Sequence, residues 1–260
     1  SIETALQEYT GIIGRIEQIH PMGGGSINEC YKIIYSGQAF VIKWNNAVKY
    51  PQMFETEAKG LELIASNKSI GVPRVVSKGE ASPYAFLLIT YVPTGSKTRN
   101  FWNTFGIQLA DLHQNTGDYF GLEYDNYIGS LIQKNNKYAD WSSFFIEMRL
   151  EPQLKLARGN KLIDRNITSA FLKLFNKIES YFPVEAPSLL HGDLWSGNFI
   201  STENDQAFLI DPAVYYGHRE MDLAMSKMFG GFDTAFYQSY NRHFPLVSGW
   251  TERTDLCNLY

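Results

Sequence analysis

A polar turn between short apolar runs constrains this chain more than any other stretch. Residues 189–200 read Leu-Leu-His-Gly-Asp-Leu-Trp-Ser-Gly-Asn-Phe-Ile, and residues 208–211 form a further apolar run that ends in a carboxylate. The runs are too short for helices and are typical of buried strands, and the polar stretch before residue 208 predicts a hairpin turn. We therefore expect Asp193, Asn198 and Asp211 at the same end of a small sheet.

These three side chains have the chemistry that phosphoryl transfer from ATP requires. A carboxylate accepts the proton of the attacking hydroxyl, and an amide and a second carboxylate hold Mg²⁺ against the phosphates. Mg²⁺ prefers hard oxygen ligands and takes few of them from the protein. The spacing His-x-Asp-x-x-x-x-Asn is that of the catalytic loop in protein kinases. We expect Asp193 to be the catalytic base, and Asn198 and Asp211 to bind the metal.

Two residues depart from the protein-kinase pattern. Gly192 stands where protein kinases have Arg, and Pro212 follows Asp211 where they have Phe-Gly. An Arg beside the base usually answers a phosphorylated activation loop, so its absence argues against that control and against a peptide kinase. The alternative is a strand-turn-strand in which Asp and Asn serve only turn chemistry. The required oxygens occur together and in order, which favours the catalytic interpretation.

The motifs around this segment resemble those of a known family. They are His-Gly-Asp-Leu-Trp-Ser-Gly-Asn (191–198), Ile-Asp-Pro-Ala (210–213), Tyr-Gly-His-Arg-Glu-Met-Asp-Leu-Ala (216–224) and Met-Phe-Gly-Gly-Phe (228–232). Over nearly the whole chain the sequence resembles the fructosamine kinase (ketosamine-3-kinase) family, in the aminoglycoside-phosphotransferase-like branch of the protein-kinase-like fold. The resemblance implies an α+β fold of two lobes, a small antiparallel-sheet lobe with one helix and a larger, mainly helical lobe. It also implies ATP-dependent phosphorylation of the 3-hydroxyl of a sugar attached to an amine.

The boundary between the lobes is expected near Pro-Thr-Gly-Ser at residues 93–96. This break divides the chain into a nucleotide-binding lobe, residues 1–92, and a catalytic and substrate lobe, residues 93–260. Residues 250–260 look like the start of an amphipathic helix, and members of the resembled family continue beyond this point. We therefore expect the C-terminal helix, with part of the substrate-side wall, to be truncated.

The first lobe contains a glycine run and a lysine with nucleotide-binding character. Gly23, Gly24 and Gly25 lie between two expected strands, and the backbone N–H groups of such a loop can approach phosphates closely. A glycine run alone is weak evidence, and no Walker A Gly-Lys-Ser/Thr follows it. Val-Ile-Lys at residues 41–43 resembles the kinase lysine that pairs with the phosphates. Lys43 shares an apolar strand face, so it needs an anionic partner unless it is a solvated strand lysine.

The following helix offers that partner. Phe54, Ala58, Leu61 and Ala65 form an apolar stripe after Pro51, and Glu57 lies on this stripe whereas Glu55 does not. We therefore expect Lys43 to pair with Glu57. The alternative is that Glu57 is a surface carboxylate at the edge of the stripe.

Several further roles are implied by the resemblance alone. It places Ile89, Tyr91 and Val92 at the hinge that binds adenine, and it gives His191 and Asp222 a structural role. An Asp at the position of Asp222 holds the catalytic loop through backbone N–H groups in related kinases.

The residues that contact the acceptor sugar are predicted with more alternatives than those that bind ATP. Trp195 is expected to cover the apolar face of the sugar, although a core position is an equal alternative because Trp is highly buried on average. His218 and Glu220 are expected to line the substrate pocket, with a surface position as the alternative. His113 is expected to be a capping or packing residue.

Composition sets limits on partners and compartment. The chain has 260 residues, a net charge of −4 and no basic run, so nothing indicates a nucleic-acid partner. No apolar stretch approaches a membrane span, and no signal-peptide pattern is present. Cys30 and Cys257 are the only cysteines, which favours a reducing cytoplasm. The alternatives to a ketosamine kinase are a kinase of another small alcohol, such as an aminoglycoside or choline, and a non-enzymatic nucleotide-binding module.

Overall fold

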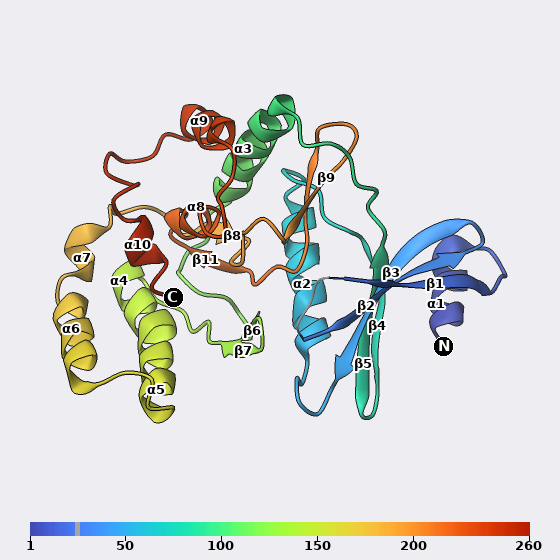
Figure 1. Ribbon diagram of the computed structural model, residues 1–260, viewed down its shortest axis with the longest axis horizontal. Helices are drawn as coiled ribbons and strands as arrows, with labels where there is room; N and C mark the ends of the chain where they lie inside the picture. The colour runs from blue at the N-terminus through green and yellow to red at the C-terminus, as the bar shows by residue number, and fades with distance from the viewer. Residues whose placement is uncertain (24–26) are drawn as a thin grey trace.

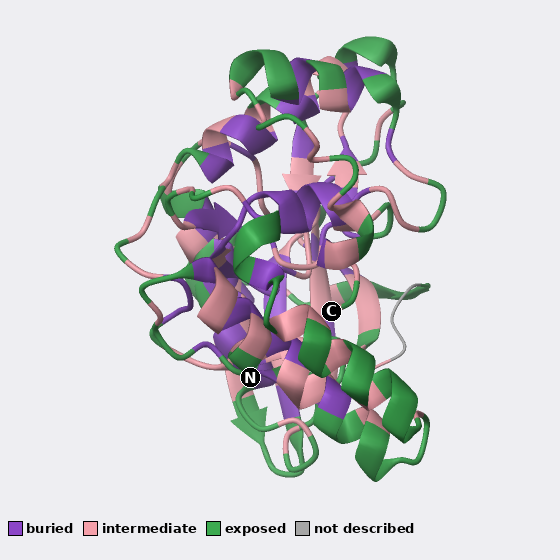
Figure 2. Ribbon diagram, turned by 90° about the vertical axis from the view of Figure 1, so that its left-hand side faces the viewer, coloured by how far each residue is buried: buried purple, intermediate pink, exposed green. Residues whose placement is uncertain are grey.

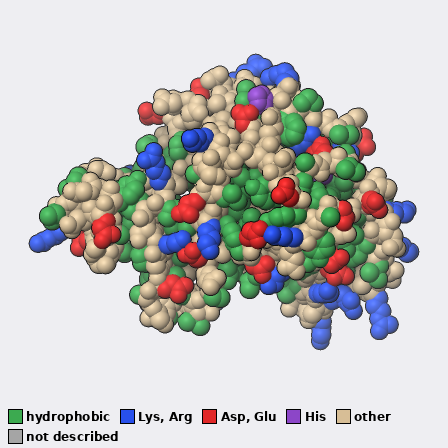
Figure 3. Space-filling view, turned by 180° about the vertical axis from the view of Figure 1, so that it is seen from behind, with side chains coloured by type: hydrophobic (Ala, Val, Ile, Leu, Met, Phe, Trp, Pro, Cys, Tyr) green, Lys and Arg blue, Asp and Glu red, His purple; other side chains and the backbone are tan. Residues whose placement is uncertain are grey.

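The chain folds into a small sheet lobe and a larger helical lobe that lie side by side (Figure 1). The computed structural model describes residues 1–23 and 27–260. Buried residues concentrate in the interior of each lobe, and the helices at the far end of the large lobe are mostly exposed (Figure 2). From behind, acidic, basic and apolar side chains are interspersed over the surface (Figure 3). In the described part of the chain, no helix has the length and apolarity needed to cross a membrane.

The small lobe is a five-stranded antiparallel sheet in the order β1-β2-β3-β5-β4. Its strands are β1 (Ile16–Met22), β2 (Glu29–Tyr35), β3 (Gln38–Asn46), β4 (Val75–Ala81) and β5 (Tyr84–Thr90), and its helices are α1 (Ile2–Thr10) and α2 (Met53–Ser66). Side chains alternate between the two faces of a strand. Leu87 and Ile89 therefore pack toward α2, whereas Leu88 packs with Leu6 of α1.

Strand β1 contains a proline. Pro21 lies inside β1 and is paired with Tyr31. An edge strand has one side without a ladder partner, so it tolerates a residue that lacks an N–H group. β1 is such an edge strand.

The large lobe contains most of the helices and, among its described residues, three pairs of short strands. The helices are α3 (Arg99–His113), α4 (Trp141–Phe144), a π-helix (Phe145–Leu150), α5 (Glu151–Gly159), α6 (Arg165–Phe175), α7 (Ile178–Tyr181), α8 (Glu220–Met225), α9 (Thr234–His243) and α10 (Thr254–Cys257). The strands are β6 (Asn126–Ile128), β7 (Leu131–Gln133), β8 (Ser188–Leu190), β9 (Phe199–Ser201), β10 (Ala207–Leu209) and β11 (Tyr215–Gly217).

An aromatic cluster fixes the strand that follows the polar turn. Phe199 of β9 packs against Phe101 and Phe105 of α3, with ring centroids 5.8 and 5.0 Å away. Phe232 lies 5.1 Å from Phe199 and 5.0 Å from Phe236 of α9. Aromatic pairs add about 0.5–1.5 kcal/mol each beyond their buried area. The cluster therefore anchors the end of the polar turn to two helices.

The sequence pattern predicted that the runs around the polar turn form one small sheet. The structure contains two separate two-stranded ladders instead. β8 pairs with β11, and β9 pairs with β10 across the predicted hairpin turn. One backbone bond extends each ladder toward the turn, from Ala213 N to His191 O at 2.9 Å for the first and from Ile210 N to Asn198 O at 3.0 Å for the second. The turn is thereby held at both ends although its flanking strands belong to different ladders.

Candidate active site

A cleft of about 630 Å³ lies between the lobes and collects most of the residues selected from the sequence. Its lining includes Gly23, Lys43, Glu57, Ile89, Tyr91, Val92, Asp193, Trp195, Asn198 and Asp211. The predictions for Gly24 and Gly25 fall outside the described residues. Chain segments far apart in sequence therefore meet at one concave site.

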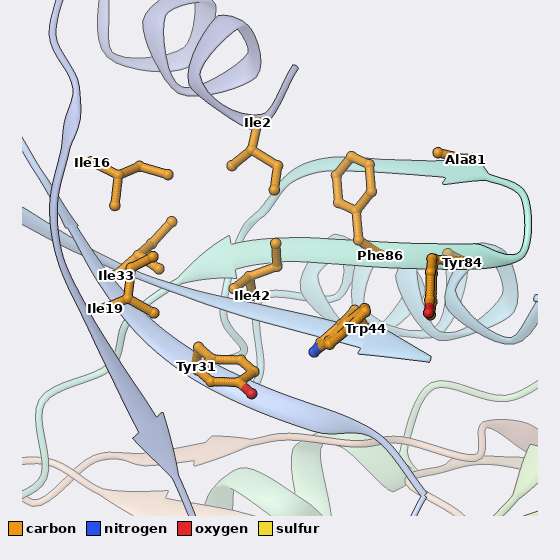
Figure 4. Close-up of a pocket in the computed structure, with 11 residues that line it drawn as sticks. Ile2, Ile16, Ile19, Tyr31, Ile33, Ile42, Trp44, Ala81, Tyr84 and Phe86 are labelled. Atoms are coloured by element: carbon orange, nitrogen blue, oxygen red, sulfur yellow. The ribbon is translucent and has the colours of Figure 1, made fainter. Parts of the chain in front are cut away.

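A second hollow, of about 470 Å³, lies on the opposite face of the small-lobe sheet (Figure 4). Its lining is apolar and aromatic, with Ile2 of α1 and Ile42, Trp44 and Phe86 of the sheet among the side chains that point into it. None of the side chains lining it is an acid, a base or a cysteine. The lysine and the carboxylates expected to act in phosphoryl transfer, Lys43, Asp193 and Asp211, line the cleft between the lobes instead.

Lys43 is buried and contacts two carboxylates. Its Nζ atom donates to Glu57 Oε1 at 2.5 Å and also to Asp211 Oδ1. Burial alone would lower the pKa of Lys43, but the charges of Asp211 and Glu57 outweigh it, raise the pKa and keep the ammonium protonated. Glu55 instead pairs with Lys59 and Lys78 at the surface. The prediction that Lys43 pairs with Glu57 and not with Glu55 is confirmed.

Asp193 and Asn198 are tied together across the polar turn. Asn198 Nδ2 donates to Asp193 Oδ2 and to the Asp193 carbonyl oxygen, both at 2.8 Å. Burial raises the pKa of Asp193, although the hydrogen bond from Asn198 opposes it. This geometry orients one carboxylate oxygen through the amide and leaves Asp193 Oδ1 without a partner among the described residues.

Asp211 and Asn198 have the donor chemistry of a magnesium site. Asp211 is partly exposed in the cleft, and only its Oδ1 is engaged by Lys43 among the described residues. The side-chain nitrogen of Asn198 makes the hydrogen bond to Asp193. The side-chain carbonyl oxygen of Asn198 takes no part in that bond and can serve as a metal ligand. One carboxylate and one amide oxygen suit Mg²⁺, which takes most of its other ligands from water and phosphates. No cluster of at least 3 His, Cys, Asp or Glu side chains that could hold a metal occurs in the described ranges.

The polar turn has a backbone conformation that requires glycine at one position. Gly192 has φ +83°, and a Cβ atom there would lie 2.1 Å from the carbonyl oxygen of Ala213. A side chain at this position would therefore be strained and would displace Ala213. The departure from the protein-kinase Arg at Gly192 thus has a local steric reason.

Asp222 holds this loop through hydrogen bonds to its backbone N–H groups. Its two carboxylate oxygens accept from His191 N at 2.7 Å and from Gly192 N at 2.9 Å, and Oδ2 also lies 3.2 Å from His113 Nε2. His191 itself is buried, with Nε2 donating to Ile210 O at 2.9 Å and Nδ1 accepting from Asp193 N at 3.2 Å. These contacts fit the structural roles expected of His191 and Asp222. His113 is fully buried and packs rather than caps.

Trp195 lies at the cleft and not in the core. Its side chain is only partly buried and lines the cleft beside Asp193. Gly197 allows this position, because a Cβ atom there would lie 2.3 Å from Cη2 of the indole ring. Of the two predicted alternatives, the structure contains the one in which Trp195 faces the cleft.

His218 and Glu220 do not line the cleft, so the expectation that they contact substrate was wrong. His218 is fully buried, with its ring 5.8 Å from Trp141 and 5.1 Å from Phe182. Glu220 is 1% exposed and forms a two-point ion pair with Arg253 at 2.6 and 2.7 Å. Packing of α8 and the strand before it on the lobe interior turns both side chains away from the cleft.

The hairpin of β6 and β7 forms part of the cleft wall that residue-level reasoning missed. Asn126 and Tyr127 line the cleft. Asn126 Nδ2 donates to Val214 O at 2.8 Å, and Gln133 Nε2 donates to Ala213 O at 3.0 Å. The hairpin thus supports the segment just after Asp211. Residues 126–129 read Asn-Tyr-Ile-Gly, a run with no helix or strand period that could reveal these contacts.

The fold and the cleft together define a phosphotransferase of the protein-kinase-like fold. An aminoglycoside phosphotransferase in ternary complex with AMP-PNP and hygromycin B has the same fold, with a TM-score of 0.67 at 13% identity, covering 100% of this chain and 88% of that one. The fructosamine kinase family model matches residues 1–260, and the chain belongs to the fructosamine kinase family.

Relatives and a solved structure agree with this membership. A probable ketoamine kinase of Synechocystis is 37% identical over 264 residues, which covers 100% of this chain and 88% of that protein. The crystal structure of a protein assigned as a fructosamine-3-kinase from Haemophilus somnus superposes with a TM-score of 0.91 at 34% identity. It covers 100% of this chain and 87% of that one.

Proposed function

We propose that this protein is a ketoamine kinase that transfers the γ-phosphoryl group of ATP to the 3-hydroxyl of a sugar attached to an amine. The observation that carries the proposal is the meeting of Asp193, Asn198, Asp211 and the Lys43–Glu57 pair in one cleft of a chain from the fructosamine kinase family. Phosphoryl transfer is catalysed mainly by positioning and by electrostatic stabilisation, and these groups supply both.

Each group has a proposed task. Asp193 accepts the proton of the attacking hydroxyl, and its orientation is set by the amide of Asn198. Lys43 stays protonated in the cleft and is directed toward the phosphates, with Glu57 holding its ammonium group in place. Asn198 and Asp211 would hold Mg²⁺, which supplies positive charge against the phosphate oxygens when bound.

The nucleotide lies along the small-lobe side of the cleft in this proposal. Ile89, Tyr91 and Val92 line that side at the end of β5 and are assigned to the adenine ring. Gly23 lines the cleft at the end of β1 and is assigned, with the rest of its glycine run, to the phosphates. We keep the division into residues 1–92 and 93–260 on this basis.

The partners are ATP and a ketoamine, with no role assigned to nucleic acid or a membrane. A cytoplasmic location is proposed because Cys30 and Cys257 are both free thiols, which fits a reducing compartment.

A comparison of acceptors tests the function. We expect ATP turnover by the purified protein with a fructose-derived ketosamine and no comparable turnover with an aminoglycoside or with choline. The measurement is ADP release coupled to detection of the phosphorylated sugar. Efficient phosphorylation of choline or an aminoglycoside, with none of the ketosamine, would contradict the proposal and favour a kinase of another small alcohol.

Substitution of Trp195 tests the acceptor side of the cleft. Trp195→Ala is expected to raise KM for the ketosamine about 2- to 30-fold and leave KM for ATP nearly unchanged, because an indole face covers a sugar and attracts an ammonium by about 0.5–2 kcal/mol. The melting temperature should move little, since the ring is not in the core. A melting temperature lowered by many degrees at unaltered acceptor KM would show a packing role instead.

A further inference from the structure

Phe229 stands out on the surface of the large lobe. It lies in the connection between α8 and α9, and 69% of its side chain is exposed. A large aromatic side chain in this position leaves most of its apolar area in water, which is unfavourable in the free protein.

The backbone of Phe229 is also unfavourable. Its φ angle is +53°, in the left-handed region that side chains other than glycine rarely adopt. Neighbouring contacts impose this conformation. Met228 N donates to Met225 O at 3.0 Å, and Gly231 N donates to Met228 O at 3.2 Å. Phe232 then inserts into the aromatic core, where it is 8% exposed.

The contact that Phe229 does make is with the cleft-lining Trp195. The two rings meet edge to face, with centroids 5.4 Å apart and an interplanar angle of 64°. Trp195 lies in the loop that carries Asp193. Phe229 itself is absent from the cleft lining, so it stands outward of Trp195 at the rim.

We propose that Phe229 is a specificity-determining residue that, with Trp195, forms an aromatic corner for the amine substituent of the ketosamine. This inference rests on the proposed ketoamine kinase function. The sugar hydroxyl must reach Asp193, so the part of the acceptor attached through the amine projects past Trp195 toward the rim. An apolar or aromatic substituent there covers the exposed ring, and the protonated amine lies beside two π-faces. Strained backbone conformations such as that of Phe229 cluster at active sites and ligand-binding segments.

Two ketosamines with the same sugar isolate the effect. One carries benzylamine and the other methylamine, so that only the substituent differs. Phe229→Gly should raise KM for the benzylamine compound about 3- to 10-fold and change KM for the methylamine compound less than about twofold. KM for ATP should be unchanged. Phe229→Tyr keeps the ring and should retain the benzylamine KM within about twofold.

Stability measurements separate this role from packing. The melting temperature of Phe229→Gly should stay within about 3 °C of the wild type, because glycine relieves the left-handed strain while the Trp195 contact is lost. The matched control is Phe232→Ala in the same segment, which should lower the melting temperature by about 10 °C because it removes a buried ring.

The outcomes are distinct. A benzylamine KM that is unchanged in Phe229→Gly, or raised equally for both compounds, contradicts the inference while the kinase function stands. A wild-type protein that phosphorylates neither compound contradicts the proposed function, and the inference falls with it.

Discussion

Replacement of Asp193 by Asn is expected to lower kcat about 10²- to 10⁴-fold while the protein remains folded. The change removes the proton acceptor but keeps the shape of the side chain. An oxygen at this position can still accept the bond that Asn198 Nδ2 donates to Asp193 Oδ2 at 2.8 Å. The measurement is steady-state turnover of the ketosamine, with the melting temperature as a check on folding. Near-normal turnover by the purified variant would remove Asp193 from the role of base.

The pH dependence of the reaction gives a second readout of the same group. Burial raises the pKa of Asp193 above its ordinary value of 3.8. A general base acts when deprotonated, so wild-type kcat should fall as the pH decreases through this raised pKa. The limb attributable to Asp193 lies above pH 3.8 and should be absent from Asp193→Asn. A variant whose residual activity kept the same acid limb would assign that limb to another group.

Replacement of Asp222 by Ala is expected to produce a large loss of stability. The buried carboxylate accepts from the backbone N–H groups of His191 and Gly192 and lies beside His113. Its removal leaves buried donors without partners, a change that costs about 3–5 kcal/mol when a charged partner is deleted. For a chain of this length the melting temperature should fall by about 10 °C. Urea unfolding monitored by circular dichroism measures the difference.

A matched control separates the network from the general effect of losing an aspartate. Asp233 also lies at the start of a helix, where its Oδ1 accepts from Ala235 N at 2.8 Å. Asp233→Ala removes only a helix cap and should cost about 1 kcal/mol, with kcat retained. Equal losses of stability in the two variants would contradict the special role of Asp222.

The effect of Asp222 should depend on pH in one direction. Burial alone would raise its pKa, but the hydrogen bond and charge of His113 and the hydrogen bond from Gly192 N outweigh it, so the pKa lies below 3.8. A lowered folded-state pKa stabilises the protein fully above the unfolded value, and the contribution is lost as the pH falls through the folded value. The stability difference between wild type and Asp222→Ala should therefore be full at about pH 7 and shrink only below pH 3.8.

The sequence by itself identified the candidate groups for the chemistry and several of their local partners. The period of apolar residues in α2 placed Glu57 on the buried stripe and Glu55 at the surface, which predicted the partner of Lys43. The spacing of Asp193, Asn198 and Asp211 indicated phosphoryl transfer because oxygens in that order are rarely needed for turns alone. The first inference succeeds because helix and strand periods record which side chains face the interior.

Tertiary structure alone decided contacts between segments distant in sequence. Lys43 also meets Asp211, and the buried Arg149 stacks 4.1 Å from the centroid of the Tyr215 ring while donating to Lys134 O at 2.6 Å. His218 and Glu220 were expected in the substrate pocket, yet packing of α8 turned them inward. Phe229 carries a strained backbone at the rim that no periodic pattern predicts. Local patterns specify burial, whereas the partner of a buried charge and the direction of a loop depend on how whole elements pack.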